Sequence, residues 1–153
     1  MGRNAQSISK ICMLGVDLLM IFVILGTQDK KFPRLLDALQ KKIDEGKISK
    51  KEEIIVQAGS TKYESKSMKI IDYMSVRKFE ECIDRADLII CHAGVGTILT
   101  ALKKGKKIIA AARLKQYGEH VNDHQLQILD NFTAEGYICL LYTSDAADDL
   151  IGV

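Results

Sequence analysis

A stretch in the middle of the chain has the residue types of a phosphate-binding turn. An apolar run, Leu88–Cys91, is followed at once by the glycine-rich segment His92-Ala-Gly-Val-Gly-Thr97. The run predicts a buried strand, and the segment after it predicts a tight turn that opens into a helix. Unpaired N–H groups and the positive end of the dipole at a helix start attract phosphate. The sequence therefore predicts a site for a nucleotide or a nucleotide-linked substrate.

Three residues of this turn have a chemical reason to be there. Gly94 and Gly96 let a ligand approach the backbone closely, because they carry no side chain. Thr97 is able either to cap the helix or to give its hydroxyl to an oxygen. Packing alone also selects glycine in a tight turn. A ligand site is nevertheless favoured, because open α/β sheets bind ligands at the carboxyl ends of their strands.

Two well-known nucleotide motifs do not occur in the chain. A dinucleotide-binding fingerprint would follow the first strand as GxGxxG, and the segment Gly26–Phe32 does not have that pattern. The P-loop pattern is also missing. A dehydrogenase or a P-loop phosphotransferase is therefore not the predicted class.

A second polar cluster lies nearer the end of the chain. It consists of Glu119, His120, Asp123, His124 and Gln125, at the start of an expected helix. The two histidines are one turn apart, but the residue after His120 is valine rather than the glutamate of a zinc protease, so no metal is predicted. Acids are also favourable at a helix start for structural reasons alone. Sugar recognition fits better, because hydroxyls need the paired donors and acceptors that Asp, His and Gln supply.

Short apolar segments alternate with segments of helical periodicity along most of the chain. Strands are expected at 20–25, 53–58, 69–71, 88–91, 107–112 and 136–140, and helices at 32–45, 75–85, 97–104 and 119–131. This alternation predicts right-handed βαβ units. The expected fold is α/β: an open parallel sheet with helices on both faces, like one Rossmann-like half of a two-domain enzyme.

Composition sets broad limits on the function. The chain has 153 residues, 47% of them hydrophobic and 27% charged, which suits one soluble domain with a real core. A net charge of +2 argues against a nucleic-acid surface. Basic residues concentrate in 41–51 and 103–107. Two interpretations are open: these are solvated helix ends, or they form a patch that binds an anionic membrane or an acidic partner. Four cysteines without a CxxC pair are typical of a reducing cytoplasm, and Cys91 is expected to be a buried thiol.

The two ends of the chain are set apart from the domain. Residues 1–19 are expected to be an N-terminal extension, because Asp17 interrupts the apolar run and no signal-peptide cleavage site follows. The domain is expected to cover residues 20–138. The segment Ile138–Asp148 back-translates into the adapter of transposon-based sequencing libraries. Residues 139–153 are therefore interpreted as an adapter-derived tail.

Four segments in order carry a family resemblance over Met20–Tyr137. They are Met20–Thr27, His92–Thr97, Gly105–Lys107 and Tyr117–Gln125. With this spacing the chain resembles the donor-nucleotide half of family 28 glycosyltransferases, which have the two-domain GT-B fold. Within that family it is similar to stand-alone donor-binding subunits. These are bacterial exopolysaccharide proteins of the PssE/EpsE type and the soluble subunit of the eukaryotic two-part UDP-GlcNAc transferase.

The resemblance implies positions for each part of a UDP-sugar. The diphosphate would lie on the turn and helix start, with the uracil near Ile71–Met74. The loop at Gly26 and Thr27 would face the cleft between two domains. The segment Asp123–Gln125 would face the sugar hydroxyls. The implied substrate-binding residues are Gly26, Thr27, His92, Gly94, Val95, Gly96, Thr97, Glu119, Asp123, His124 and Gln125.

The resemblance also implies how catalysis would be shared. His92 is the candidate for stabilising the leaving UDP, and no residue is assigned as the general base. Many relatives carry glutamate for ribose binding where this chain has Thr100, and Glu119 is the acid that would replace it. No cofactor and no metal are expected, and the UDP-sugar is the donor substrate.

The function implied by the resemblance is an inverting hexosyltransferase that is active only with a partner. The partner would be a membrane-anchored acceptor-binding subunit, which would hold the chain at the inner face of the plasma membrane in the cytoplasm. The acceptor would be a lipid-linked glycan, and the product a surface polysaccharide such as an exopolysaccharide or capsule. Two alternatives stay open. One is a non-catalytic nucleotide-sugar-binding or scaffolding module of a polysaccharide synthase, and the other is an interaction subunit that binds no ligand.

Overall fold

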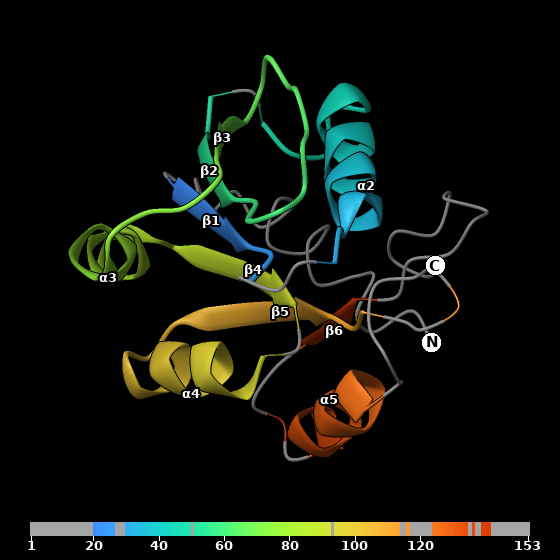
Figure 1. Ribbon diagram of the computed structural model, residues 1–153, viewed down its shortest axis with the longest axis vertical. Coiled ribbons are helices and arrows are strands. Elements are labelled where there is room, and N and C mark those ends of the chain that lie inside the picture. Colours follow the sequence, from blue (N-terminus) through green and yellow to red (C-terminus); the bar gives the residue numbers. More distant parts are fainter. Residues whose placement is uncertain are drawn as a thin grey trace.

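The described part of the chain forms one parallel α/β sheet with helices on both faces, as the sequence predicts. The computed structural model describes residues 20–26, 30–49, 51–92, 94–113, 116, 124–134, 136 and 139–141. The strands are β1 (Met20–Ile24), β2 (Glu53–Gln57), β3 (Lys69–Ile71), β4 (Leu88–His92), β5 (Lys107–Ala111) and β6 (Cys139–Leu141). The helices are α2 (Pro33–Asp44), α3 (Val76–Arg85), α4 (Val95–Lys103) and α5 (His124–Ala134). The strand order is β3-β2-β1-β4-β5-β6, with every pair parallel (Figure 1).

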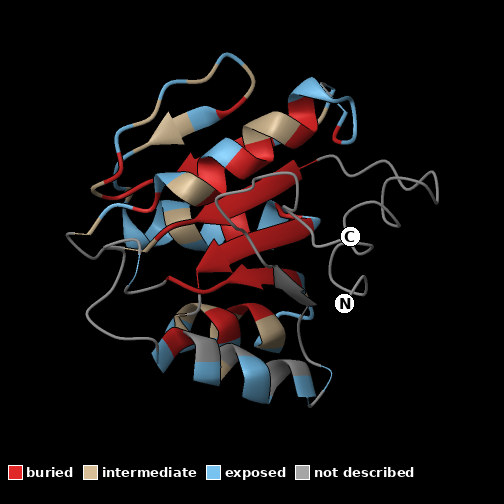
Figure 2. Ribbon diagram, turned by 90° about the vertical axis from the view of Figure 1, so that its right-hand side faces the viewer, coloured by how far each residue is buried: buried red, intermediate tan, exposed pale blue. Residues whose placement is uncertain are grey.

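The sheet has apolar cores on both faces. Figure 2 shows buried strands between α2 on one side and α4 with α5 on the other. In β1, Ile21 and Val23 belong to the core beneath α2, whereas Met20, Phe22 and Ile24 belong to the core that includes residues of α3 and α4. Successive strand residues point to opposite faces, so a strand covered on both sides must be apolar throughout. This is the physical reason for the continuous apolar runs in the sequence.

Two side chains, one local and one distant in the sequence, stabilise the ends of α3. At its start, the Ser75 hydroxyl accepts a hydrogen bond from the backbone N–H of Lys78 at 3.2 Å. At its end, the Lys106 ammonium donates to the carbonyl oxygens of Asp84 (2.8 Å) and Ala86 (3.0 Å). A cation on the last carbonyls also compensates the negative end of the helix dipole. These contacts stabilise the end of α3 at Arg85, shortly before β4 begins at Leu88.

The strand order reverses direction between β1 and β4. The chain moves from β1 to β2 and β3 on one side, then returns to place β4 on the other side of β1. Ile24 of β1 pairs with Cys91 of β4, so these two strands end at the same level. In an open parallel sheet a crevice forms at such a reversal, outside the carboxyl ends of the two strands. The topology thus fixes where a ligand site is to be expected.

The helix after β4 begins earlier than the sequence predicted. We expected it to start at Thr97, but α4 begins at Val95, with Gly94 as its cap residue. Gly94 has an extended backbone (φ −82°, ψ 118°) and makes no side-chain capping bond. The prediction that Thr97 caps the helix is therefore wrong, because Thr97 is already its third residue.

The last two elements end later than predicted: α5 ends at Ala134 instead of residue 131, and β6 ends at Leu141 instead of residue 140. The structure describes α5 from His124 onward, whereas residues 117–123 lie outside the described part of the chain. Strand β6 occupies Cys139–Leu141 and pairs with β5. These three residues fall in the segment interpreted as an adapter-derived tail. That origin stays a prediction, which the nucleotide sequence behind the segment tests.

Cys82 and Cys91 are buried free thiols. Cys91 is fully buried in β4, and burial raises its pKa to about 12. Burial also raises the pKa of Cys82. A thiol that stays protonated at neutral pH is a poor nucleophile, so both act as packing residues. The expectation of a buried thiol at Cys91 is confirmed.

The helices of the described residues are short and amphipathic. Of these helices, none combines the length and the hydrophobicity that crossing a membrane would require.

Replacing Phe22 by alanine should destabilise the sheet strongly. Its ring is fully buried and meets Phe79 edge-on at 5.5 Å. We expect the free energy of unfolding, measured by urea denaturation, to fall by about 3–5 kcal/mol. Val76→Ala is the control: Val76 is 75% exposed, and we expect a change of less than about 0.5 kcal/mol. Equal losses in the two variants would contradict this account of the core.

Candidate functional site

A pocket of about 440 Å³ opens at the reversal between β1 and β4. It lies at the carboxyl ends of these strands, between the starts of α3 and α4. Its lining residues are Ile24, Gly26, Gln57, Met74, Val76, Phe79, His92, Gly94, Gly96 and Thr97. Its volume is within the range of small-molecule sites, about 300–1,000 Å³. The crevice that the topology requires is therefore open and large enough for a ligand.

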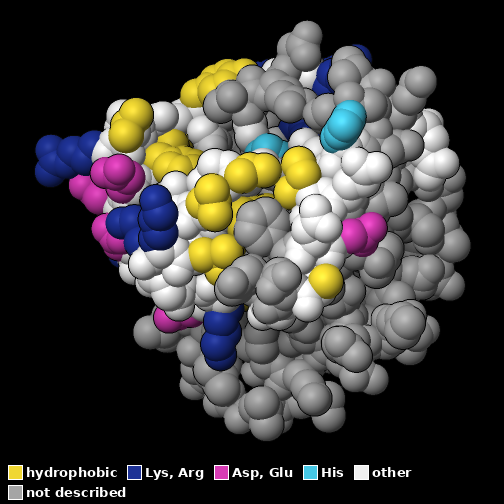
Figure 3. Space-filling view, turned by 90° about the horizontal axis from the view of Figure 1, so that it is seen from below, with side chains coloured by type: hydrophobic (Ala, Val, Ile, Leu, Met, Phe, Trp, Pro, Cys, Tyr) yellow, Lys and Arg dark blue, Asp and Glu magenta, His cyan; other side chains and the backbone are white. Residues whose placement is uncertain are grey.

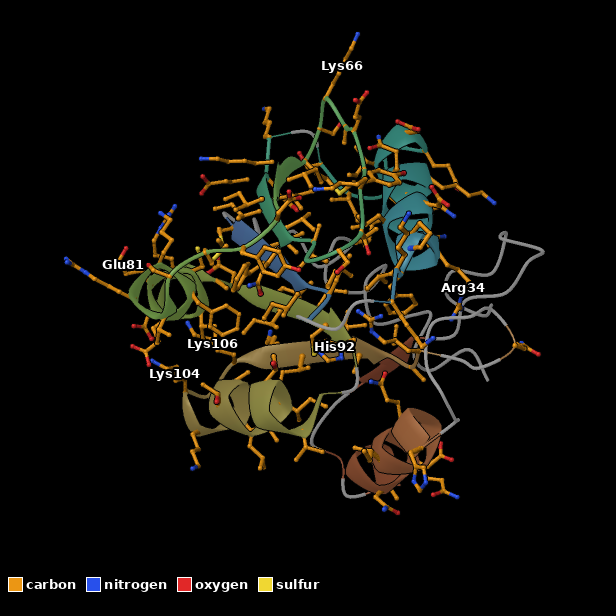
Figure 4. The ribbon with its side chains drawn as sticks, in the orientation of Figure 1. Arg34, Lys66, Glu81, His92, Lys104 and Lys106 are labelled. Carbon is orange, nitrogen blue, oxygen red and sulfur yellow. The ribbon has the colours of Figure 1, made fainter. Side chains whose placement is uncertain are left out.

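His92 lies at the centre of this site, at the end of β4 (Figure 4). The residue is only 7% exposed, and its ring is packed between two glycines. A Cβ atom on Gly26 would lie 2.6 Å from Nε2 of His92, and one on Gly94 would lie 2.5 Å from Cε1. Real Cβ atoms do not approach other atoms so closely, so the ring occupies the room that the two missing side chains leave.

The start of α4 supplies the polar character of one end of the pocket. The N–H groups of Val95, Gly96 and Thr97 have no acceptor within the helix, because they belong to its first turn. A Cβ atom built on Gly96 meets no heavy atom within 4 Å. The first turn of α4, where these donors and the positive end of the helix dipole lie, therefore borders the open pocket at Gly96 and Thr97. This arrangement suits an anionic group such as a phosphate.

The other end of the pocket is apolar. It is formed by Ile24 together with Met74, Val76 and Phe79, which precede or begin α3. Met74 lies in the segment that the family resemblance places by the base of a nucleotide. Gln57, at the end of β2, is a polar residue on this side of the pocket, and no sequence pattern predicts it as a site residue.

The structure brings together five of the residues predicted from sequence. Gly26, His92, Gly94, Gly96 and Thr97 all line the pocket. Their neighbour Val95, the first residue of α4, is 40% exposed and does not line it. Gly94, which was expected to let a ligand approach the backbone, makes room for the His92 ring, and so does Gly26.

Of the second predicted cluster, the structure describes His124 and Gln125, and neither of these two lines the pocket. His124 is exposed at the start of α5, and Gln125 beside it is buried. The carboxamide oxygen of Gln125 accepts a hydrogen bond from the backbone N–H of Arg113 at 2.9 Å. Thr27, Glu119 and Asp123 lie outside the described residues, so their contacts with a sugar remain predictions.

Arg113 is a buried residue that the sequence analysis missed. Its guanidinium donates to the carbonyl oxygens of Leu25 and Lys30, the latter at 2.6 Å. It also lies over the ring of Phe32, 5.2 Å from the centroid, which is a cation–π contact. Arg113 thereby ties the end of β5 to the chain that leaves β1. An arginine after an apolar strand has no sequence signal for this role, because all its partners are distant in the chain.

Gly26→Ala should destabilise the protein more than Gly46→Ala does. Both glycines have positive φ (+84° and +76°), so alanine meets a backbone penalty of about 1–2 kcal/mol at either position. Only at Gly26 does the new methyl group collide with His92. A Cβ atom built on Gly46 meets no heavy atom within 4 Å. We expect an additional loss of about 1–3 kcal/mol at Gly26 in urea denaturation.

A second substitution isolates the collision. Adding His92→Ala to the Gly26→Ala variant removes the ring and should recover most of the additional loss. If Gly26→Ala and Gly46→Ala cost the same, or if removing the ring recovers nothing, the packing of His92 against Gly26 is not what requires glycine.

Comparisons with known proteins agree with this architecture. Residues 20–144 match the glycosyltransferase family 28 C-terminal domain. Similar curated proteins include UDP-N-acetylglucosamine transferase subunit ALG13 of Homo sapiens, 32% identical over 76 residues, and that of Saccharomyces cerevisiae, 35% identical over 72 residues. The matches cover 50% and 46% of this chain. They span only 6% of the human protein and 34% of the yeast protein.

A solved structure supports the fold. The crystal structure of the glycosyltransferase SnogD from Streptomyces nogalater has a TM-score of 0.58 with this chain at 19% identity. The match covers 82% of this chain and 31% of SnogD. With a family match that extends over most of its length, the chain belongs to the glycosyltransferase family 28 C-terminal domain family.

Proposed function

We propose that this chain is the donor-binding subunit of a two-component, UDP-sugar-dependent hexosyltransferase. The observation that carries the proposal is the pocket at the reversal between β1 and β4, which the first turn of α4 borders beside His92. One polar end and one apolar end match the diphosphate and the base of a nucleotide. The relatives named as UDP-N-acetylglucosamine transferase subunits support the same donor class.

The residues of the site fit a role in stabilising the leaving group. In an inverting transfer, an acceptor hydroxyl attacks the anomeric carbon while the bond to UDP breaks and negative charge grows on the diphosphate. The N–H groups and dipole of α4, with a ring N–H of His92, are placed to stabilise that charge. These donors are held in place by the fold, so little reorganisation accompanies the reaction.

The described residues of the pocket do not supply a general base. Among the described residues that line the pocket, none is a carboxylate, and His92 is enclosed by two glycines. An acceptor hydroxyl needs a base within hydrogen-bonding distance to lose its proton. We therefore infer that a second protein component completes the active site from the opposite side of the pocket.

An apolar rim supports such a partner. Val76, Val95 and Leu99 are exposed at 75%, 40% and 43% beside the start of α3 and along α4. Figure 3 shows hydrophobic side chains gathered on the face that carries α4. Val95 and Leu99 lie one turn apart on α4, and exposed apolar neighbours of this kind are typical of surfaces that another protein covers. We propose a membrane-anchored acceptor-binding subunit, which would hold this chain at the inner face of the plasma membrane.

The proposed acceptor is a lipid-linked glycan, and the proposed product is part of a surface polysaccharide. Both proposals follow from the resemblance to stand-alone donor subunits of exopolysaccharide synthesis. No cofactor is needed, since the donor sugar is already activated by its diphosphate.

Gly96→Leu should weaken UDP binding at least tenfold without harming the fold. The new side chain enters open space at the start of α4, where a phosphate would otherwise approach the backbone. The smaller substitution Gly96→Ala tests whether the fold accepts a side chain here. It should raise the free energy of unfolding by about 0.5–1 kcal/mol, because alanine favours the helix. Calorimetric titration with UDP should show at least a tenfold loss of affinity for Gly96→Leu.

The control for this experiment is Lys103→Leu, which places the same side chain on the exposed last turn of α4. It should bind UDP like the wild type. If wild-type protein releases no heat with UDP, the proposal is wrong and the interpretation as an interaction subunit is favoured.

The chain alone should bind a UDP-sugar weakly and show little transferase activity. Adding membranes that contain the acceptor-binding subunit should raise the rate of sugar transfer by at least a hundredfold, because the base and the acceptor arrive together. Transfer of radiolabelled sugar from several UDP-sugars into lipid measures this. Unchanged binding with no gain in rate would instead favour a non-catalytic scaffolding module. Full activity without a partner would refute the two-component proposal.

A further inference from the structure

Gln57 is a polar side chain in otherwise apolar surroundings. It is the last residue of β2, is only 5% exposed, and lines the pocket. Its register partners are Ile24 in β1 and Ile71 in β3, so its side chain lies on the face of the sheet that α3 covers. The pocket residues Met74, Val76 and Phe79 complete these surroundings.

The carboxamide of Gln57 is available to a ligand. Its backbone carbonyl accepts a hydrogen bond from the N–H of Leu25 at 3.0 Å. Within the part of the chain that the structure describes, the side chain has no hydrogen-bonding partner, and neither of its polar atoms is fully enclosed. A buried amide is unfavourable unless it forms hydrogen bonds. An adjacent donor and acceptor therefore point into the pocket and remain to be satisfied there.

We propose that Gln57 recognises the base of the bound nucleotide, an inference that rests on the proposed function. The pocket walls around it are apolar and suit the faces of a flat heterocycle. The carboxamide suits an edge with a neighbouring donor and acceptor. In uracil these are N3–H and O4: N3–H donates to the carboxamide oxygen of Gln57, and O4 accepts from its NH₂ group.

The arrangement favours a base over the sugar at this position. A hexose presents hydroxyls in several directions and needs several polar partners. The end of the pocket near Gln57 offers one carboxamide among Ile24, Met74, Val76 and Phe79. The diphosphate would lie at the other end, on the first turn of α4. Gln57 is thus a specificity-determining residue, with its effect on the base and not on the phosphates.

Gln57→Met tests the proposal, since methionine has nearly the same length and shape but no donor or acceptor. Calorimetric titrations would use UDP, N3-methyl-UDP and inorganic pyrophosphate. We expect the variant to bind UDP about tenfold more weakly than the wild type does, as for the loss of a buried hydrogen-bonded pair. Pyrophosphate affinity should stay within twofold. The wild type should also prefer UDP to N3-methyl-UDP, and the variant should lose that preference.

Two further variants keep the test decisive. Gln57→Glu preserves the side-chain shape and should also weaken UDP binding, because a carboxylate cannot donate to O4. Gln40→Met is the matched control: Gln40 lies on α2, where it bonds with Asp44 and Ser65, and its loss should leave all affinities unchanged. Circular dichroism verifies that each variant is folded.

The outcomes separate this inference from the proposed function. If wild-type protein binds UDP while Gln57→Met binds it equally well, or still discriminates against N3-methyl-UDP, the role of Gln57 is refuted and UDP binding stands. If both Gln57 variants lose pyrophosphate affinity along with UDP affinity, Gln57 stabilises the structure of the pocket and does not recognise the base. If the wild type does not bind UDP, the proposed function itself fails.

Discussion

The site depends on the packing of one imidazole ring between two strand ends. His92 ends β4, and it fits beside β1 only because Gly26 and Gly94 have no side chains. The parallel pairing of Ile24 with Cys91 brings both strand ends to the same level, so the ring fills the gap where the strand order reverses. Sheet topology and site chemistry are thereby coupled. Because His92 ends β4 and α4 follows directly, a shift of β4 by one residue would move the ring and the start of α4 together.

The polar end of the pocket is formed by the first turn of α4. The described lining residues include no lysine or arginine, and among them the backbone N–H groups and the dipole of α4 are what attract an anion. Backbone donors lose no side-chain entropy when a ligand binds, which would suit the binding and release of UDP in the proposed function. The apolar end near Phe79 and Met74 would add affinity by burial. In the proposed complex these two contributions would act on different parts of one nucleotide.

The sequence predicts the framework of this site better than its details. Apolar runs identify β1 and β4 because strands buried on both faces have no polar alternation. The start of α4 was misplaced by two residues, since the extended backbone of Gly94 ends the strand and begins the helix without a side-chain cap. Gln57 and Arg113 were missed for a different reason. Their importance comes from register and from contacts with distant residues, and neither leaves a local pattern.

Arg113 connects the chain that leaves β1 with the start of α5. Its guanidinium holds the carbonyl oxygens of Leu25 and Lys30, on either side of the loop that follows β1, while its backbone N–H binds the carboxamide oxygen of Gln125. The bond from Arg113 fixes the orientation of the Gln125 carboxamide, and it leaves the NH₂ group and the second lone pair of the oxygen for other partners. The residue that holds the two carbonyl oxygens after β1 thus also orients a side chain at the start of α5.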